Sequence, residues 1–203
     1  LAKLLSDNLT RIAHHGGRAD AIIRSMLDHS RRSHGDLRSV EVNTVVDDAV
    51  TLAYHGARAL DSTFNVNMIT DYGEDVGSVT MDSQEISRVL LNLISNAFYA
   101  TNERAATEPR YEPEVTVRTR RGDGFINIHV RDNGVGIDKE IQEKLFKPFF
   151  TTKPPGEGTG LGLSLSYDIV SRQHGGTITV ESEKGEYTEF CIRLPAALPS
   201  TEA

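Results

Sequence analysis

Residues 115–137 read VTVRTRRGDGFINIHVRDNGVGI. Apolar and polar side chains alternate over residues 115–120 and again over 125–130, and this period of two predicts a pair of strands. The sequence Gly-Asp-Gly at 122–124 is typical of a tight hairpin turn. Two glycines follow the second strand, where they let the backbone come close to a ligand. We therefore expect an antiparallel hairpin whose second strand ends at Asp132.

Helical and strand patterns alternate on both sides of this hairpin. Helices are expected at 1–34, 43–59, 82–97, 138–146 and 161–174, and further strands at 40–42, 64–69, 177–181 and 189–194. Asn43 and Asp82 are the expected N-caps of two of these helices, and Asp82 with Glu85 has the spacing of a capping box. Three helices on one face of a mixed sheet is the simplest packing. The prediction is an α/β two-layer sandwich preceded by a long N-terminal helix.

The composition is that of an ordinary globular chain. Its 203 residues are 38% apolar and 25% charged, and the net charge of -7 disfavours nucleic acid and anionic membranes as partners. Cys191 is the single cysteine, which fits a reducing compartment, and a buried structural thiol is its simplest interpretation. No apolar run is long enough to span a membrane and no secretory signal is visible. We expect a cytoplasmic fragment of a longer protein, in which a missing part can carry a membrane anchor.

A second glycine-rich stretch, GEGTGLGL at 156–163, runs directly into a predicted helix. Successive backbone N–H groups and the positive end of a helix together attract an anion such as a phosphate. The stretch is neither a Walker loop nor a dinucleotide-binding fingerprint, because the lysine and the preceding strand of those motifs are missing. The alternative interpretation is a flexible hinge.

Two asparagines and one aspartate complete the set of candidate ligand-binding residues. Asn92 and Asn96 are four residues apart and share one face of their predicted helix. An amide oxygen can ligate Mg²⁺, which takes few ligands from protein and the rest from phosphates and water. Asp132, at a strand end before two glycines, can accept a hydrogen bond from an exocyclic amine. The alternatives are ordinary polar residues and a simple tight turn.

In order and spacing these elements resemble the N box and the glycine boxes of the GHKL superfamily of ATP-binding proteins. The stretch FKPFFTTK at 146–153 resembles the F box of bacterial sensor histidine kinases, and HGGTI at 174–178 resembles the last glycine motif. The resemblance covers about residues 36–195. It implies the GHKL (Bergerat) ATP-binding fold, ATP and Mg²⁺ as ligands, and a sensor histidine kinase of two-component systems.

The resemblance also implies roles for matched positions. Asp132 binds the adenine amino group, Asn96 ligates Mg²⁺, and residues Thr151 to Gly158 form a mobile lid. The role of Tyr99 is open, and the usual Gly-Thr pair before Thr188 is interrupted by Glu186 and Tyr187. The complete implied ATP-binding set is Asn92, Asn96, Tyr99, Asp132, Gly134, Gly136, Ile137, Thr151, Thr152, Lys153, Gly158, Thr159, Gly160, Leu161, Gly162, Leu163 and Thr188.

The same superfamily contains hydrolysing ATPases, which carry a glutamate general base four residues before the metal-binding asparagine. That position is Asn92 here, and an amide cannot take a proton from water. This favours phosphoryl transfer to a protein histidine over hydrolysis. The alternatives are a GHKL ATPase, a non-enzymatic interaction module that has kept the fold, and a serine kinase of the anti-sigma or mitochondrial dehydrogenase-kinase kind.

The expected organisation is a partial dimerisation and phosphotransfer helix at 1–35, an ATP-binding catalytic domain at 36–197 and a tail at 198–203. The first segment resembles the second helix of a histidine kinase dimerisation hairpin. His14 and His15 lack the acidic neighbour and the later proline of an acceptor site, so the acceptor histidine is expected outside this chain. The implied partners are a response-regulator receiver domain and, through the hairpin helices, a second copy of the full-length protein. Nucleic acid is not an expected partner.

Overall fold

The structure is a computed structural model that describes residues 37–154 and 158–196. The predicted N-terminal helix, with His14 and His15, and the predicted C-terminal tail lie outside the described residues. Among the described helices, none is both long and apolar enough to cross a membrane.

Five strands form one mixed sheet and two short strands form another. The large sheet has the order β2-β4-β5-β7-β6, in which β2 is parallel to β4 and the other neighbours are antiparallel. Its strands are β2 (Asn67–Tyr72), β4 (Glu114–Gly122), β5 (Phe125–Asp132), β6 (Thr177–Glu183) and β7 (Tyr187–Pro195). The small sheet pairs β1 (Arg38–Glu41) with β3 (Ser78–Met81).

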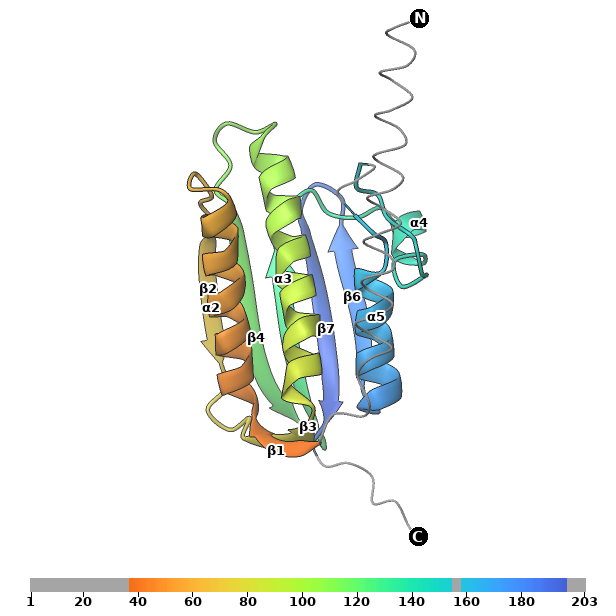
Figure 1. The fold of residues 1–203 in the computed structure, drawn as a ribbon. Helices are drawn as coiled ribbons and strands as arrows, with labels where there is room; N and C mark the ends of the chain where they lie inside the picture. Colours follow the sequence, from red (N-terminus) through yellow and green to blue (C-terminus); the bar gives the residue numbers. More distant parts are fainter. Residues whose placement is uncertain (1–36, 155–157, 197–203) are drawn as a thin grey trace, which may run out of the picture.

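The described helices are α2 (Val42–Leu60), α3 (Ser83–Ala105), the short α4 (Lys139–Gln142) and α5 (Gly162–Asp168), which continues as the π-helical turn η1 (Ile169–Gln173). Helices α2, α3 and α5 cover one face of the large sheet (Figure 1). This arrangement confirms the predicted two-layer α/β sandwich with three helices on one face.

The core lies between α3 and the middle of the sheet. Leu90, Leu93 and Ile94 of α3 are fully buried, as are Ile128 of β5 and Ile192 of β7. Burying one such side chain stabilises a fold by about 1.5–3 kcal/mol, so this layer fixes α3 against the sheet. Helix α3 therefore gives a rigid support for any polar side chain on its remaining face.

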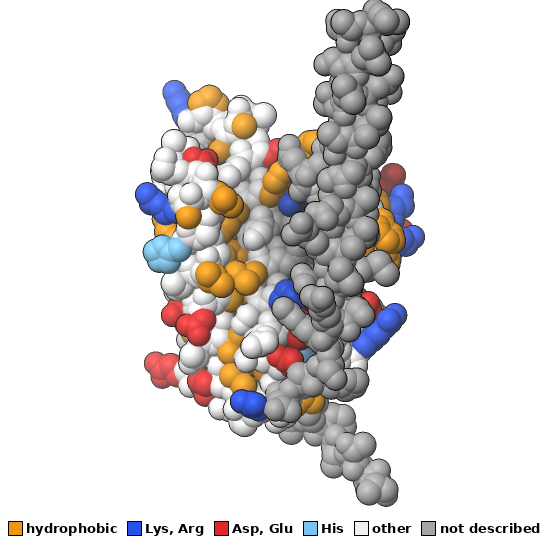
Figure 2. All heavy atoms as spheres, in the orientation of Figure 1, with side chains coloured by type: hydrophobic (Ala, Val, Ile, Leu, Met, Phe, Trp, Pro, Cys, Tyr) orange, Lys and Arg blue, Asp and Glu red, His pale blue; other side chains and the backbone are white. Residues whose placement is uncertain are grey.

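Apolar side chains on the helix-covered face are scattered among charged and polar ones (Figure 2). Leu52 and Leu60 of α2 are the most exposed of the large apolar side chains described. Single exposed apolar residues are normal on a protein surface. They do not mark a docking site by themselves.

Two predictions near the start of the domain differ from the structure, namely the N-cap at Asn43 and the first residue of the strand at 64–69. Asn43 lies inside α2, whose N-cap is Glu41, and its amide instead donates to the carbonyl oxygen of Gly73 at 2.9 Å and accepts from the Thr119 hydroxyl at 2.7 Å. The strand predicted at 64–69 begins only at Asn67, because Phe64 is buried in a loop with its ring edge-on to a phenylalanine of α3. The alternation reflects loop packing over residues 64–66 and the strand β2 only from Asn67 onward. Strand β3 was not predicted.

The helix predicted at 138–146 is also shorter than expected, since α4 ends at Gln142. Asp82 caps α3 as predicted, accepting from the backbone N–H groups of Gln84 and Glu85. The return bond of a capping box is not made by Glu85, because the Asp82 N–H donates to Nε2 of His174 at 3.0 Å. His174 is buried and its Nδ1 lies 2.8 Å from the carbonyl oxygen of Ile169. The His-Gly-Gly motif thus joins η1 to the start of α3.

Candidate functional site

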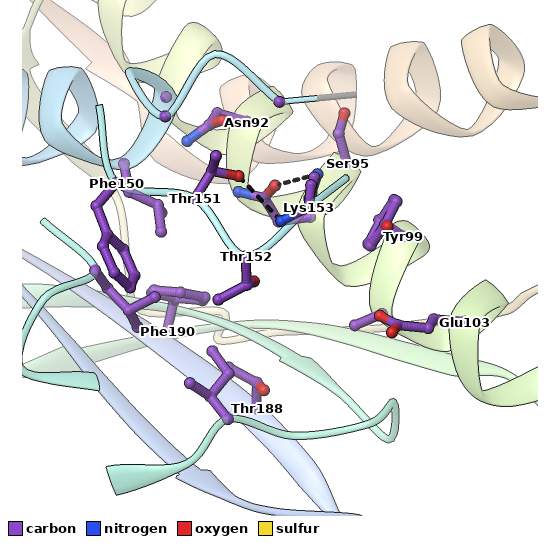
Figure 3. Close-up of a pocket in the computed structure, with 18 of the residues that line it drawn as sticks. Asn92, Ser95, Tyr99, Glu103, Phe150, Thr151, Thr152, Lys153, Thr188 and Phe190 are labelled. Atoms are coloured by element: carbon purple, nitrogen blue, oxygen red, sulfur yellow. Dashed lines mark hydrogen bonds between the residues drawn. The ribbon is translucent and has the colours of Figure 1, made fainter. Parts of the chain in front are cut away.

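A cavity of about 390 Å³ lies between α3, the turn that follows β5, and the segment around residues 150–163 (Figure 3). Thr188 of β7 lies across the cavity from Asn92 of α3 in this view. Every residue of the implied ATP-binding set lines the cavity except Gly134 and Leu161. The tertiary structure therefore brings together three sequence motifs that are far apart along the chain.

Asp132 occupies the sheet side of the cavity, at the end of β5. Its side chain is 4% exposed, and its Oδ1 accepts a hydrogen bond from the N–H of Gly134 at 2.9 Å. Burial raises the pKa of Asp132 to about 7, against the opposing effect of the Gly134 hydrogen bond and the nearby charge of Arg131. A buried carboxyl group that still borders the cavity can accept a hydrogen bond from a ligand amine.

Close backbone packing fixes the turn that carries Asp132. Gly136 has a φ of +63°, and a Cβ at this position would lie 2.1 Å from the carbonyl oxygen of Glu183. Gly134 does not line the cavity, because it packs on α3, where a Cβ would lie 2.6 Å from the carbonyl carbon of Ala100. The two glycines are therefore required by the approach of β6 on one side and of α3 on the other.

Lys153 and the asparagines of α3 meet on the opposite side of the cavity. Nζ of Lys153 donates to Oδ1 of Asn96 at 2.9 Å and lies 4.3 Å from the centre of the Tyr99 ring. Nδ2 of Asn92 donates to the hydroxyl of Ser166 at 3.0 Å. These contacts place an ammonium group, a ring and two amides beside the glycine-rich stretch.

The glycine-rich stretch approaches this side of the cavity with its backbone. A Cβ on Gly162 would lie 2.2 Å from Oδ1 of Asn92, and one on Gly160, whose φ is +70°, would lie 2.4 Å from the carbonyl carbon of Phe149. Leu161, between these two glycines, does not line the cavity. It is the N-cap residue of α5, and its carbonyl oxygen accepts from the N–H of Leu165 at 2.9 Å. The backbone can therefore come close to an anion here.

Several lining residues were missed from the sequence: Ser95, Ala100, Glu103, Val135, Leu145, Phe150 and Phe190. Ser95, Ala100 and Glu103 lie on the same face of α3 as Asn92 and Asn96, so helical periodicity could have found them. Phe190 follows Thr188 by two residues on β7 and points to the same side. Phe150 belongs to the stretch at 146–153 that resembles the F box, whereas Leu145 carries no local signal, because only the tertiary structure brings it to the cavity.

The cavity suits a metal ion only if a bound molecule supplies most of its ligands. Among residues 37–154 and 158–196, no group of three or more His, Cys, Asp or Glu side chains could hold a metal. Asn96 offers one hard amide oxygen, which accepts a hydrogen bond from Lys153. Mg²⁺ commonly accepts such a set, with one or two protein ligands and the remainder from phosphates and water. The donor set therefore fits Mg²⁺ that arrives together with a polyphosphate.

Cys191 lies on β7, away from the cavity. Its side chain is only half-buried, which differs from the buried thiol expected, and its Sγ lies 3.8 Å from Nε2 of His129. Burial, together with the charge of Glu189, raises the pKa of the Cys191 thiol. A thiol with a raised pKa is a poor nucleophile, so Cys191 has no evident part in the chemistry of the site.

Comparisons with known proteins agree with this geometry. Residues 81–198 match the family described as histidine kinase-, DNA gyrase B-, and HSP90-like ATPase. The sensor kinase CckA of Brucella abortus is 33% identical over 97% of this chain and 21% of its own length. The signal transduction histidine-protein kinase AtoS of Escherichia coli is 33% identical over 86% of this chain and 26% of its own length. The chain thus spans about a quarter of the length of these relatives.

Among solved structures, a nucleotide-free catalytic domain of the histidine kinase ThkA superposes with a TM-score of 0.65 and 28% identity, covering 79% of this chain and 96% of that domain. ThkA has also been crystallised with the response regulator protein TrrA. In that structure it superposes with a TM-score of 0.70 over 91% of this chain and 49% of ThkA, but the 24% identity there supports the fold alone.

Proposed function

Since the chain belongs to the family of histidine kinase-, DNA gyrase B-, and HSP90-like ATPases, we propose that it binds Mg²⁺-ATP and transfers the γ-phosphoryl group to a protein histidine. The acceptor histidine lies outside this chain, and the phosphoryl group passes from it to an aspartate of a response regulator. The observation that carries the proposal is that a buried carboxyl group, Asp132, and the side-chain oxygen of Asn96 line opposite sides of one cavity.

Asp132 recognises the base in this proposal. The amino group of adenine donates to the carboxyl group of Asp132, while Gly136 and Ile137 line the base. Thr188 faces Asp132 across the β5–β7 ladder, and its hydroxyl lies 3.0 Å from that of Ser182. Two polar groups of neighbouring strands thus border the end of the cavity where the base would bind.

Asn96 ligates Mg²⁺ in this proposal, and the ion neutralises the phosphate charge when bound. The backbone of Gly158, Gly160 and Gly162 lies against the phosphates, with Asn92 nearby. Thr151, Thr152 and Lys153 belong to the segment that closes over the nucleotide. Phosphoryl transfer needs mainly positioning and charge neutralisation, so no further reactive side chain is required on this domain.

We favour transfer to a protein over hydrolysis because no carboxylate around the cavity is placed to act as a hydrolytic base. Asn92 occupies the position of a hydrolytic base, and its amide donates to Ser166. Glu85 does not line the cavity. Glu103 does, but it lies eleven residues beyond Asn92 on α3, about 16 Å away along a helix that rises about 1.5 Å per residue. Asp132, the other lining carboxyl group, is at the end of β5 on the base side, so no carboxylate among the described lining residues is placed to activate water at the phosphates.

The partners follow from the same proposal. ThkA, which shares this fold, assembles with a response regulator. Residues 1–35 serve as part of a dimerisation and phosphotransfer hairpin, residues 36–197 are the catalytic domain, and 198–203 are a tail. In the full-length protein the hairpin joins two copies.

The proposal is tested with γ-labelled ATP and a separately supplied acceptor hairpin. We expect acid-labile label on the hairpin, none on this chain, and little release of free phosphate. The transfer should be weak, because the docking energy of a covalently joined hairpin is absent. Steady phosphate release without labelled hairpin would identify a hydrolase. Acid-labile label on this chain that disappears in the double variant His14→Gln/His15→Gln would place the acceptor histidine within the chain.

A further inference from the structure

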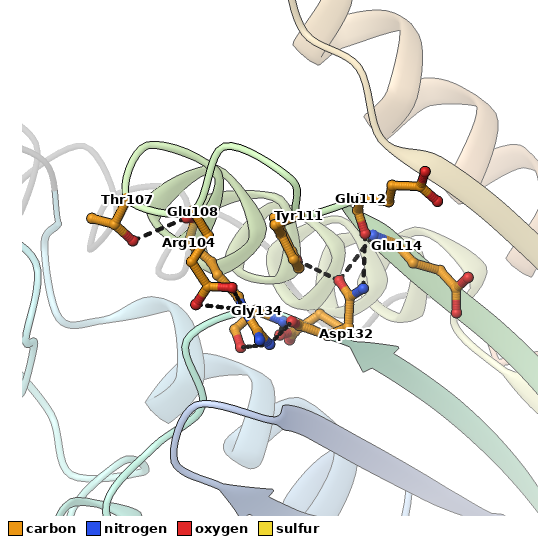
Figure 4. Close-up of polar contacts among 9 residues, drawn as sticks. Arg104, Thr107, Glu108, Tyr111, Glu112, Glu114, Asp132 and Gly134 are labelled. Atoms are coloured by element: carbon orange, nitrogen blue, oxygen red, sulfur yellow. Dashed lines mark hydrogen bonds and ion pairs between the residues drawn. The ribbon is translucent and has the colours of Figure 1, made fainter.

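The turn that presents Asp132 to the cavity is held from its outer side by a group of residues at the end of α3 (Figure 4). Nη1 of Arg104 donates to the carbonyl oxygen of Asn133 at 2.8 Å and lies 3.4 Å from that of Gly134. Both carbonyl groups belong to the residues directly after Asp132. The contact of these two carbonyl groups with Arg104 fixes the orientation of the turn from the side that faces away from the cavity.

The side chain of Asn133 ties the same turn to the loop that follows α3. Its Oδ1 accepts from the N–H of Glu114 at 2.9 Å and from the hydroxyl of Tyr111, and its Nδ2 donates to the carbonyl oxygen of Glu112 at 2.9 Å. Its backbone N–H donates to the carbonyl oxygen of Glu114 at 3.2 Å. The side chain thus bridges the turn and residues 111–114.

Arg104 is itself oriented by two further groups. Its Nε lies 3.1 Å from both carboxylate oxygens of Glu108, and its guanidinium carbon lies 4.8 Å from the centre of the Tyr111 ring. A planar guanidinium has five donors in a fixed fork, so it can satisfy a carboxylate and two carbonyl groups while it stacks on a ring. A lysine ammonium, which is a compact point charge, cannot satisfy all of these partners in one position.

Tyr111 remains a donor under all ordinary conditions. Its ring is partly buried, and this burial raises the pKa of its hydroxyl to about 12. A neutral hydroxyl donates to Oδ1 of Asn133, which leaves the amide group of Asn133 in the orientation described above. The N–H of Tyr111 donates to the carbonyl oxygen of Glu108 at 3.1 Å, so the loop turns back onto the end of α3.

We propose that Arg104 and Tyr111 are positioning residues that make the domain selective for a 6-amino purine over a 6-oxo purine. They do so by fixing the turn that aims the carboxyl group of Asp132 at the base. The inference rests on the proposed function, because it takes the base-binding role of Asp132 as its premise. Arg104 lies on the same helix as Asn96, so α3 sets both the metal side and the base side of the cavity.

The chemistry of the two bases makes this selectivity measurable. The 6-amino group of adenine donates a hydrogen bond to a carboxylate, whereas hypoxanthine presents a 6-oxo oxygen that can only accept. Above the pKa of about 7, where Asp132 is ionised, ATP therefore gains from a well-aimed Asp132 and ITP gains nothing at its 6-oxo oxygen, so the two nucleotides are compared at about pH 8. A turn that moves away from its position lowers the affinity for ATP and leaves the affinity for ITP unchanged or raises it.

The test is calorimetric titration of the whole chain with Mg²⁺-ATP and with Mg²⁺-ITP. Arg104→Lys should reduce the ratio of ATP to ITP affinity about tenfold, and Tyr111→Phe about threefold, as for the loss of one or two hydrogen bonds. Arg110→Lys is the matched control for the first variant, since Arg110 is exposed in the loop that follows α3. Tyr54→Phe, on α2, is the matched control for the second. Both controls should keep the wild-type ratio.

Three results would overturn the inference. An unchanged ratio in both variants, with ATP still bound, would show that Arg104 and Tyr111 do not aim Asp132, and the proposed function would stand. Equal weakening of ATP and ITP would assign the two residues to general stability, and thermal unfolding of each variant measures that contribution separately. If the wild-type chain bound neither nucleotide, the proposed function itself would be wrong, and the inference would fall with it.

Discussion

The two sides of the cavity are built differently. On the base side, the turn at 132–136 is fixed by contacts within the protein, from Arg104 on its outer side to Glu183 beneath Gly136. On the phosphate side, the oxygen proposed to ligate Mg²⁺ accepts from Lys153, a residue of the segment that faces the nucleotide. The contacts on the base side can persist when a ligand binds. The contact between Lys153 and Asn96 has to be replaced by contacts to Mg²⁺ and the phosphates.

This difference assigns recognition of the base to one side of the cavity and closure over the phosphates to the other. A pre-formed base side costs little reorganisation on binding, so it can supply selectivity. On the phosphate side the polar groups contact one another, and these contacts keep them satisfied until Mg²⁺ and phosphates replace them. The following predictions, from the largest expected effect to the smallest, test this contrast.

The largest effect is expected from Gly136→Ala on the base side. Gly136 and Gly175 have nearly the same positive φ, +63° and +62°, but only Gly136 has backbone atoms where a Cβ would lie. Gly175→Ala should lower the free energy of unfolding by about 1–2 kcal/mol, the cost of the left-handed conformation. Gly136→Ala should lower it by about 3 kcal/mol more, because backbone cannot move aside as a side-chain tip can. Equal losses in denaturant titrations would show that the turn is not rigidly packed.

Asp132→Asn should weaken ATP binding by about 2 kcal/mol or more, as for a lost charge-assisted hydrogen bond. Calorimetry measures the loss, and unchanged affinity in a folded variant would remove Asp132 from the site. Lys184→Gln is a suitable control, because Lys184 pairs with Asp138 at 2.7 Å near the surface, outside the cavity lining.

The same variant should change the dependence of stability on pH. Burial raises the pKa of Asp132 to about 7 in the folded chain, from an ordinary value of 3.8. Between these two values the folded chain holds a proton that the unfolded chain has lost, so stability falls as pH rises through this window. Asp132→Asn lacks this dependence and should be the more stable protein at about pH 8. Parallel stability curves for wild type and variant would contradict the burial of an ionisable group there.

Hydrogen exchange should distinguish the two sides directly. On addition of Mg²⁺-ATP, exchange should slow at least about tenfold in the described parts of the segment 147–160, because contacts there are replaced by contacts to nucleotide. Exchange in residues 132–136 should change much less, because that turn is already fixed. Equal exchange at 147–160 with and without saturating nucleotide would count against a lid.

The smallest effect is expected from Thr159→Ala on the phosphate side. The N–H of Leu161 donates to the Thr159 hydroxyl at 3.3 Å, which is a long bond at the start of α5. Its loss should change the free energy of unfolding by less than about 0.5 kcal/mol. Asp82→Ala offers the contrast, since Asp82 caps α3 with bonds of 2.9 and 3.2 Å, and should cost about 1 kcal/mol. A larger loss for Thr159→Ala than for Asp82→Ala would show that the phosphate side is fixed as firmly as the core helix.

Local sequence patterns predicted secondary structure correctly where an element is determined by residues close to it in the chain. The hairpin of β4 and β5 was predicted because a period of two and a Gly-Asp-Gly turn are both local signals. The pairing of β1 with β3 was not, because it joins two short strands about forty residues apart. The alternation at 64–69 located β2 but placed its start three residues too early, since a buried loop can alternate as a strand does.

The candidate site shows the same division. The glycines could be recognised in the sequence because only glycine allows backbone segments to approach so closely. The asparagines and Asp132 could be recognised because they are polar residues within otherwise apolar stretches. Arg104 and Tyr111 were not singled out, and His174 was noted only as the first residue of a glycine motif, because an arginine, a tyrosine or a histidine near a helix end is common. Their roles depend on which turn or helix end lies within reach after folding.

The sequence by itself determined the α/β sandwich, the glycine turns and the set of polar residues proposed to bind nucleotide. The sandwich and the turns follow from local residue type and spacing, and the polar set from the order of several local motifs along the chain. Only the tertiary structure decided which side chains complete the cavity, that His174 accepts from the N–H of Asp82 at the start of α3, and that Arg104 holds the turn of Asp132. These depend on hydrogen bonds and packing between segments far apart in the chain, for which neither periodicity nor a local motif carries a signal.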